Sequence, residues 1–413
     1  MNRYRRFFDT IIEEWLKTSQ KALFVHGLPG IGKETLIIEF LKERMPIFEI
    51  DCRDREIQDA FRLANHQLSF QRISHRPGYT EEAAFVFSHA DSCAGLIERT
   101  KALLSTGKRI VFVFDRYEKT LQESKFFPLG YVTELVVEPL TFTEYCWANG
   151  VGQTDLLRYC DAAKEGKPLP EGVFQRFQQL WDRYLFIGGY PAVVKADMQG
   201  KWASRELYLA DAQNKAADYI RTCYGKKAKT LYASVGHARS GFFDRFVSSR
   251  ASKGATYGTY AESIELLSER RLLVKVPYWQ NGTPSKDVSL FYPDSGFMRS
   301  SLGIANESEL TDGAYHLLEM GAIARVLNRK GFELHKEHSY GYSPDLICRK
   351  EADEFAVEIK SGRGVRLRID KILSYPKGKG LFVLSPNNRI LFEDKQKVLP
   401  TCMFALMVEG GML

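Results

Sequence analysis

Residues 21–36 contain the feature that most limits the folds open to this chain. An apolar run ends at His26, a glycine-rich turn follows from Gly27 to Gly32, and Lys33 begins an amphipathic run. The turn has the spacing G-x4-G-K of a phosphate loop, in which backbone N–H groups surround phosphate oxygens and the lysine reaches the terminal phosphates. The pattern predicts a strand, a phosphate loop and a helix whose N-terminus adds partial positive charge.

One position of this loop departs from the usual pattern. Glu34 stands where a Ser or Thr hydroxyl normally ligates Mg²⁺, and Thr35 comes one place late. A carboxylate at that position also repels a β-phosphate unless a metal lies between them. We therefore expect a phosphate cradle for ATP that has lost its usual Mg²⁺ ligand. The predicted nucleotide-binding residues are Gly27, Gly30, Gly32, Lys33, Glu34 and Thr35.

The length and composition predict a globular protein of several domains. Of the 413 residues, 44% are hydrophobic and 26% are charged. A chain of this length is too long to fold around a single hydrophobic core, so two to four domains are expected. No apolar run approaches the length of a membrane span, and acidic residues interrupt the first apolar stretch, unlike a signal peptide. Seven scattered cysteines without a C-x2-C pair predict reduced thiols. We expect a cytoplasmic protein with no membrane partner.

Strands and helices alternate after the loop. The expected strands that follow the one before the loop are 47–51, 83–88, 109–114 and 132–137, and the expected helices include 6–18, 57–67 and 93–104. This alternation predicts an α/β fold with a doubly wound parallel sheet and right-handed crossovers.

The second half of an ATPase site would be an acid at the end of the third strand, where it holds Mg²⁺. Here that strand ends in Ser88-His89, so both metal-holding positions are altered and we expect weak or absent hydrolysis. Two alternatives stay open, Asp115 after the fourth strand and Asp91 beyond the third. We rank Asp115 second, because that alignment leaves strand 83–88 unexplained.

Positive charge is concentrated between residues 221 and 275. This window holds eleven lysines and arginines against four acids, an excess equal to the formal charge of +7 for the whole chain. It predicts either a DNA-facing surface or a solvated charged face. The same region has the pattern of a winged helix. Two helices are expected, at 240–246 and 260–269, and two hairpin strands follow at 270–277 and 288–292. Such modules bind duplex DNA or dock other proteins.

A second set of chemically active residues lies near the C-terminus. Asp345 precedes one strand, and Glu358 and Lys360 lie on the next, where alternation puts them on the same face. This is the pattern of a P-D-x(n)-[D/E]-x-K nuclease, in which Asp345 and Glu358 hold Mg²⁺ and Lys360 stabilises phosphate charge. Glu319, on an expected helix at 315–328, is a further candidate metal ligand. The alternative is an inherited fold that only binds, with Glu358 and Lys360 paired.

Five segments carry a resemblance that spans nearly the whole chain. They are the loop 27–33, Pro139-Leu-Thr-Phe-Thr-Glu144, Phe186-Ile-Gly-Gly-Tyr-Pro-Ala-Val-Val194, Leu290-Phe-Tyr-Pro-Asp-Ser-Gly296 and Val357-Glu-Ile-Lys-Ser-Gly362. In this order they resemble bacterial and archaeal ATP-binding proteins with an AAA-like P-loop ATPase domain, a helical region, a winged helix and a C-terminal restriction-endonuclease-like domain. The chain departs from that family at Glu34, at Ser88-His89 and at Tyr131, where an arginine is usual.

The resemblance implies four parts, which are a P-loop NTPase domain at 1–148, a helical lid at 149–225, a winged helix at 226–303 and a PD-(D/E)xK nuclease-like domain at 304–413. We expect a nucleotide-binding, DNA-associated protein with a degenerate hydrolysis site, coupled to a possible Mg²⁺-dependent nuclease. The alternatives are an active ATPase with metal ligation through Glu34, and a non-enzymatic DNA-binding or adaptor protein. The sequence does not specify the oligomeric state.

Overall fold

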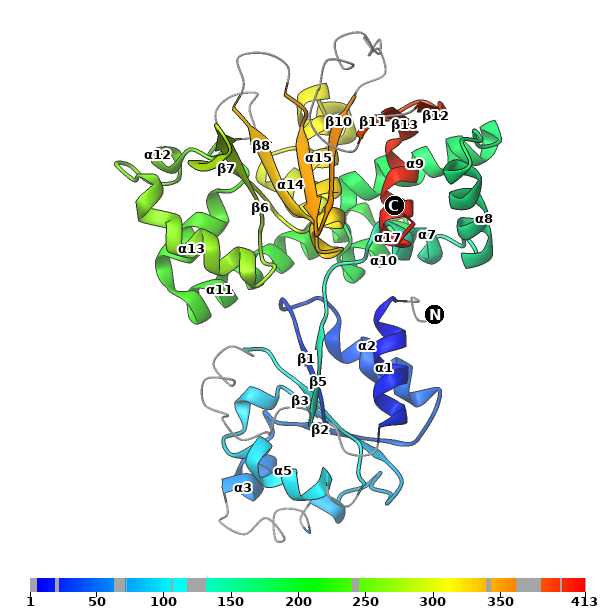
Figure 1. Ribbon diagram of the computed structural model, residues 1–413. Coiled ribbons are helices and arrows are strands. Elements are labelled where there is room, and N and C mark those ends of the chain that lie inside the picture. The colour runs from blue at the N-terminus through cyan, green and yellow to red at the C-terminus, as the bar shows by residue number, and fades with distance from the viewer. Residues whose placement is uncertain are drawn as a thin grey trace. The chain divides into compact units, whose positions relative to one another are not determined.

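The structure is a computed structural model (Figure 1), and its contacts divide the chain into two compact units. The first unit comprises residues 1–138 and 210–223, and the second comprises 139–209 and 224–413. The described residues are 6–18, 22–62, 71, 73–104, 107–116, 131–239, 245–338, 343–361, 380–393 and 396–412.

The first unit is built on a five-stranded parallel sheet of order β2-β3-β4-β1-β5. Its strands are β1 (Ala22–His26), β2 (Ile47–Asp51), β3 (Ala84–Ser88), β4 (Ile110–Val113) and β5 (Val132–Val136). Its helices are α1 (Phe8–Lys17), α2 (Lys33–Lys42), α3 (Arg55–Arg62) and α5 (Leu96–Leu104), and a short 3-10 helix, η1, covers Ala90–Ser92.

The two faces of this sheet bury different residues because side chains alternate along each strand. On one face, Phe24, Phe85 and Phe112 form an apolar core with Phe61 of α3 and Leu96 of α5. Figure 1 shows α1 and α2 on the opposite face, where both helices bury their apolar sides. The predicted α/β class and parallel sheet are confirmed. Helix α3 is observed to residue 62, and the rest of the expected 57–67 helix lies outside the described residues.

The second unit combines a mixed eight-stranded sheet with surrounding helices. Its strands are β6 (Val274–Gln280), β7 (Thr283–Phe291), β8 (Glu333–Glu337), β9 (Leu346–Lys350), β10 (Asp353–Ile359), β11 (Leu381–Ser385), β12 (Leu391–Glu393) and β13 (Gln396–Pro400), in the order β12-β13-β11-β10-β9-β8-β6-β7. Its helices are α7 (Phe142–Ala148), α8 (Gln153–Lys164), α9 (Glu171–Ile187), α10 (Pro191–Met198), α12 (Ser248–Ala251), α13 (Tyr257–Glu269), α14 (Ser295–Ser301), α15 (Asp312–Arg329) and α17 (Thr401–Glu409), with a 3-10 helix, η2, at Glu307–Glu309. Helix α11 (Trp202–Ser234) has residues in both units, and its helical geometry is interrupted at Gly225.

The hairpin expected as a wing belongs to this larger sheet. Strands β6 and β7 pair antiparallel, and β6 continues the sheet by pairing parallel with β8, Tyr278 opposite Lys336. The expected helix 260–269 lies within α13. Residues 240–244 of the other expected helix lie outside the described residues, and Arg245 and Phe246 form β-bridges instead of helix. Arg245 bridges to Ser289, and Phe246 bridges to Arg239.

The C-terminal helix α17 is the centre of the helical part of this unit. All nine of its residues are buried, and it packs on α7, α8, α9 and α15. The Glu409 carboxylate accepts hydrogen bonds from the backbone N–H groups of Phe142 (3.2 Å) and Thr143 (2.7 Å), at the N-terminus of α7. Thr141 and Glu144 form a capping box on the same helix. The Pro139–Glu144 motif is therefore a helix cap with a buried partner from the C-terminus.

Two further motifs of the resemblance meet at a close-packed joint. The buried Asp294 carboxylate accepts hydrogen bonds from the N–H groups of Gly189 (2.7 Å) and Phe297 (3.0 Å). A Cβ added at Gly189 would lie 2.3 Å from the Leu140 carbonyl oxygen, and one at Gly296 would lie 2.3 Å from the Ile187 oxygen. Gly296 lets the turn after β7 approach the end of α9, and Gly189 lets the segment after α9 approach Leu140.

The four-part division of the chain stays a prediction. Residues 149–209 of the expected lid group with the second unit, where α8 and α9 pack on α17. Among the described residues, no helix has the length and apolar character that crossing a membrane requires.

Candidate functional site

The phosphate loop joins β1 to α2 at the carboxyl edge of the parallel sheet. Gly27, Gly30 and Gly32 all have positive φ angles, of 145°, 76° and 81°. A Cβ at Gly27 would lie 2.2 Å from the carbonyl oxygen of Val137, which directly follows β5. Glycine is required at Gly27 for both reasons, since other residues rarely adopt this φ and no side chain fits there.

Lys33 is folded into this loop. Its ammonium donates hydrogen bonds to the carbonyl oxygens of Gly27 (3.0 Å) and Leu28 (3.3 Å), and the residue is only 6% exposed. Burial lowers the pKa of the Lys33 ammonium, and the nearby carboxylates of Asp115, Asp91 and Glu34 oppose that shift. The buried cation is thus held by neutral carbonyl groups of its own loop.

The two altered metal positions contact each other. Glu34 lies at the start of α2 and His89 directly follows β3 with a left-handed backbone (φ 53°). The Nε2 atom of His89 lies 3.5 Å from Glu34 Oε1, and its Nδ1 contacts Asp115 Oδ2. Thr35 is exposed. The sequence patterns that single out Glu34 and His89 do not predict this contact, because the two residues are far apart in the sequence.

All three candidate positions for the metal-holding acid lie at one edge of the sheet. Strand β4 lies between β1 and β3, so Asp115 and His89 follow neighbouring strands. Asp91 Oδ1 accepts a hydrogen bond from the Asp115 N–H (2.8 Å). Asp115 is therefore tied to both His89 and Asp91.

These residues do not fit Mg²⁺ as they are arranged. Within the described ranges no three His, Cys, Asp or Glu side chains are placed to hold a metal ion. Mg²⁺ requires a near-octahedral shell of oxygen ligands. Here the imidazole of His89 lies between the Glu34 and Asp115 carboxylates, so these oxygens do not converge on an ion.

The second candidate site lies on β9 and β10. These strands pair antiparallel with Leu346 opposite Val357, so Asp345 and Glu358 occupy the next opposed positions and share one face. The Asp345 Oδ2 atom accepts a hydrogen bond from the Ile359 N–H (2.7 Å). Lys360 pairs with the Glu358 carboxylate. The structure brings Asp345, Glu358 and Lys360 to the same part of the sheet.

Helix α15 contributes two more side chains. His316 Nε2 lies 3.4 Å from Asp345 Oδ1, and its Nδ1 lies 3.1 Å from the Ser361 hydroxyl. The buried Glu319 carboxylate accepts hydrogen bonds from the Ser361 hydroxyl and from the Trp181 indole N–H (3.1 Å). Sequence reasoning missed His316 and Ser361. The helical spacing of His316 and Glu319, three residues apart on one face, was the available signal.

The charges at this site are mutually compensated. Burial alone would raise the pKa of Asp345, but the hydrogen bond and charge of His316 and the charge of Lys336 hold it below its ordinary value. Burial works against protonation of His316, yet Asp345 and Glu319 raise its pKa above the ordinary value. Burial raises the pKa of Glu319. Each carboxylate has its own protein partner, so the described residues do not present a formed Mg²⁺ site here either.

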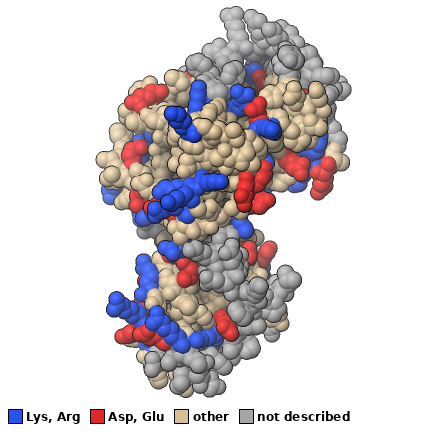
Figure 2. Space-filling model, turned by 90° about the vertical axis from the view of Figure 1, so that its left-hand side faces the viewer, with Lys and Arg blue, Asp and Glu red and all other residues tan. Residues whose placement is uncertain are grey.

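The basic window 221–275 is only partly available to a ligand. Arg239 is buried and donates to backbone carbonyls, and ion pairs join Arg245 to Asp287 (3.1 Å) and Lys275 to Glu265. The exposed basic residues are Arg221, Lys226, Lys227, Arg250, Lys253, Arg270 and Arg271. On the face drawn in Figure 2, lysines and arginines form several groups with acidic side chains between them.

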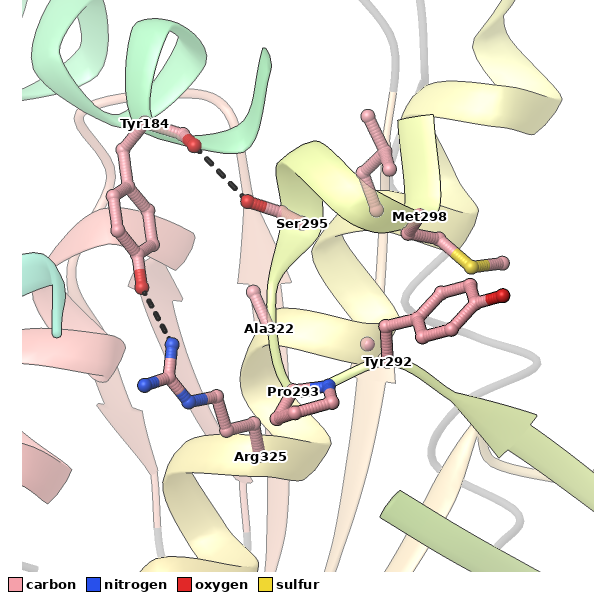
Figure 3. A pocket seen from close by; sticks show the side chains of 9 residues that line it. Tyr184, Tyr292, Pro293, Ser295, Met298, Ala322 and Arg325 are labelled. Atoms are coloured by element: carbon pink, nitrogen blue, oxygen red, sulfur yellow. Dashed lines mark hydrogen bonds between the residues drawn. The ribbon is translucent and has the colours of Figure 1, made fainter. Parts of the chain in front are cut away.

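The cavity in Figure 3 is a small gap between packed side chains. It is lined by Tyr184, Tyr292, Pro293, Ser295, Met298, Leu318, Gly321, Ala322 and Arg325. Its volume of about 10 Å³ leaves room for one water molecule at most. The Ser295 hydroxyl donates to the Tyr184 carbonyl oxygen (3.0 Å), and Arg325 donates to the Tyr184 hydroxyl (3.1 Å). It is too small for a substrate.

No family model matches this sequence, and no curated protein matches it. Among solved structures, the chain is similar to a Walker-type ATPase of Pyrococcus abyssi, with 15% identity, a TM-score of 0.41 and coverage of 73% of this chain and 96% of that chain. It is also similar to AMPPCP-bound DnaA from Aquifex aeolicus (14%, 0.28, 66% and 90%) and to Drosophila ORC bound to DNA (13%, 0.24, 72% and 95%). At these TM-scores the matches carry no argument, and the fold assignment rests on the sheet and loop described above.

The raised pKa of Glu319 predicts a pH-dependent difference between the protein and its Glu319→Gln variant. Because the folded protein raises the pKa of the Glu319 carboxyl above its ordinary value of about 4.5, its contribution to stability is full below that value and is lost as pH rises through the folded pKa. Between those two pKa values, the unfolding free energy of the unmodified protein should fall relative to the variant by roughly 1.4 kcal/mol for each unit of pH. Urea denaturation at a series of pH values measures this.

The exposed Glu333 provides the control for this comparison. The Glu333→Gln variant makes the same chemical change at an exposed position, so its pH series shows how much of the difference comes from the substitution itself. A flat difference for Glu319→Gln would show that burial does not raise the pKa of this carboxyl.

Proposed function

We propose that this chain is a nucleotide-binding P-loop protein with weak or absent ATP hydrolysis. The observation that carries the proposal is the glycine loop at Gly27–Gly32, with three positive φ angles, in which the Lys33 ammonium donates to the carbonyl oxygens of Gly27 and Leu28. A nucleotide phosphate would replace those neutral partners with charged oxygens, which are stronger acceptors. ATP is the proposed ligand, through the loop residues together with Glu34 and Thr35.

Weak hydrolysis is proposed because the metal positions are occupied by other interactions. Phosphoryl transfer depends on positioning and on neutralising the charge of the phosphates, which Mg²⁺ normally does. The contact between Glu34 and His89 supports the loss of that role. The competing possibility is an active ATPase in which Glu34 itself ligates the metal.

Lys33→Ala should weaken nucleotide binding. The expected loss of affinity is at least about tenfold, because a charge-assisted contact to phosphate is removed. Calorimetric titration of the full chain with ATP measures it. Lys42→Ala is the matched control, since Lys42 lies on the same helix α2 and is exposed in an ion pair with Glu49. Sustained ATP turnover in Mg²⁺ that Lys33→Ala abolishes would favour the active-ATPase alternative.

We also propose that the 221–275 region contacts DNA. The exposed lysines Lys226, Lys227 and Lys253 support this proposal. When lysines neutralise DNA phosphates, the counterions condensed on the DNA are released, which favours binding. The proposed winged helix, with α13 as the second helix, would supply the docking geometry.

Neutralising Lys226, Lys227 and Lys253 together should reduce the salt dependence of duplex binding. Each phosphate contact contributes a slope of about −0.9 in a plot of log affinity against log salt concentration, so losing three contacts should shift the slope by about 2.7. Fluorescence anisotropy with a labelled duplex measures the slope. The control neutralises Lys164, Lys195 and Lys201, which are exposed outside the window. An unchanged slope in the first variant contradicts DNA contact at these positions.

A second proposed activity is DNA cleavage by a nuclease-like domain at residues 304–413. The opposed positions of Asp345 and Glu358, and the pairing of Glu358 with Lys360, support it. In the proposal Asp345, Glu358 and Glu319 are candidate metal ligands and Lys360 is the electrostatic partner. Because their carboxylates are engaged by protein partners, binding of Mg²⁺ would require them to rearrange.

Asp345→Asn should strongly reduce cleavage of linear and plasmid DNA in Mg²⁺ or Mn²⁺. The variant keeps a side-chain oxygen for the Ile359 N–H and removes the charge, so the fold should be preserved while activity falls by about a hundredfold or more. Gel analysis of the products measures it, with the exposed Asp353→Asn as control. No cleavage by the unmodified protein, or cleavage unchanged in Asp345→Asn, would favour a non-enzymatic DNA-binding or adaptor protein.

A further inference from the structure

The C-terminal end of β6 carries two aromatic side chains that the proposed functions do not use. Tyr278 and Trp279 are consecutive, so they point to opposite faces of the sheet. Each stacks on a histidine from β8 or the residue after it. The ring centres of Trp279 and His335 are 4.3 Å apart, and those of Tyr278 and His338 are 4.8 Å apart, with interplanar angles of 25° and 27°.

The two stacks differ in burial. His335 is 5% exposed, and burial lowers the pKa of its ring to about 4, so its stack with Trp279 belongs to the interior. The side chain of His338, in contrast, is 35% exposed. Among the described residues no second ring stacks on His338. The Tyr278/His338 stack is therefore a pair of rings at the surface of the second unit.

The other contact of His338 holds its ring by the edge. Its Nε2 atom lies 3.1 Å from Asp287 Oδ2, and Asp287 is itself paired with Arg245 (3.1 Å). A hydrogen bond to a ring nitrogen lies in the plane of the imidazole, so it leaves both faces for stacking. Tyr278 covers one of these faces. The other face of the partly exposed ring can accept a further flat ring.

This stack lies at the same end of the sheet as the candidate nuclease residues. Strand β8 lies between β6 and β9, and Tyr278 of β6 is opposite Lys336 of β8. Continuing the register of β8 with β9 places Glu337 opposite Asp345. Tyr278 and Asp345 are thus two strands apart, which is roughly 10 Å. A stacked DNA strand advances about 3.4 Å per nucleotide, so about three nucleotides span this separation.

A buried cation lies next to the stack. The Lys336 ammonium is 5.9 Å from the centre of the Tyr278 ring and contacts the Met320 sulfur at 3.1 Å. Its charge also acts on Asp345, so it influences both the stack and the candidate nuclease site. Aromatic rings beside positive charge are the two components with which proteins bind single-stranded nucleic acid.

We propose that the Tyr278/His338 stack binds an unpaired base of single-stranded DNA beside the candidate nuclease site. Inside a duplex each base is covered by its neighbours, whereas a single strand can present a base face to a protein ring. His338 receives the base, and Tyr278 supports the imidazole from its other side. The inference goes beyond the proposed duplex contact of the 221–275 region, and it requires no cleavage.

The test is fluorescence anisotropy of the full chain in excess EDTA, with a labelled single-stranded oligonucleotide and with a duplex of the same length. Two variants separate stacking from the contact with Asp287. His338→Phe keeps a flat ring and should bind the single strand within about twofold of the unmodified protein. His338→Asn keeps a polar group for Asp287 but has no ring, so it should weaken that binding by about fivefold or more. Neither variant should change the affinity for the duplex.

His237→Asn is the matched control, since His237 is another exposed histidine of the same unit and should leave the single-strand affinity unchanged. Loss of binding in His338→Phe with retention in His338→Asn overturns the inference, because the contact with Asp287 would then matter and stacking would not. Equal affinities in the two variants overturn it as well, whether both are lowered or neither is.

The unmodified protein provides a test that needs no variant to fold. Binding of the duplex alone overturns this inference and leaves the proposed DNA contact standing. Binding of neither DNA overturns both together. If single strands bind with the expected variant pattern but are not cut in Mg²⁺ or Mn²⁺, this inference stands and the proposed nuclease activity fails.

Discussion

The close approach of the Gly27 backbone to the Val137 carbonyl is the constraint on which the phosphate-loop site depends. Any Cβ at Gly27 would lie 2.2 Å from that oxygen, so only glycine allows β1 and β5 to pair up to the point where the loop begins. Because both strands end there, the loop turns back over the edge of the sheet and α2 starts at Lys33. The loop brings Lys33 within hydrogen-bonding distance of its own carbonyl groups. The residues after β3 and β4 then become neighbours of α2.

Both candidate sites have a histidine beside an aspartate. His89 lies between Glu34 and Asp115, and His316 lies between Asp345 and the Ser361 hydroxyl. In each case the carboxylate that a metal would use is already engaged by a protein group. A metal site would instead leave oxygen atoms converging on one point. In the described parts of both sites the carboxylates therefore contact protein side chains.

The motifs of the second unit that carry the family resemblance are explained by packing. The Pro139–Glu144 segment caps α7 and receives the Glu409 carboxylate, while Gly189 and Gly296 belong to the joint around Asp294. The hydrogen bonds of Glu409 to Thr143 and of Asp294 to Gly189 each connect residues more than a hundred positions apart. Such residues are fixed by close approach and by buried hydrogen bonds, and a chemical role is not needed to account for them.

The sequence by itself determined the local features of this protein. The G-x4-G-K spacing predicted the strand, loop and helix, the alternation of strands with helices predicted the parallel sheet, and the two-residue period placed Glu358 and Lys360 on one face. Only the tertiary structure decided that His89 lies against Glu34, that His316 lies against Asp345, and that β6 continues the C-terminal sheet beside β8. The physical reason is distance along the chain. Periodicity and turn chemistry act over a few residues, whereas these contacts join separate elements and form only when the strands and helices pack.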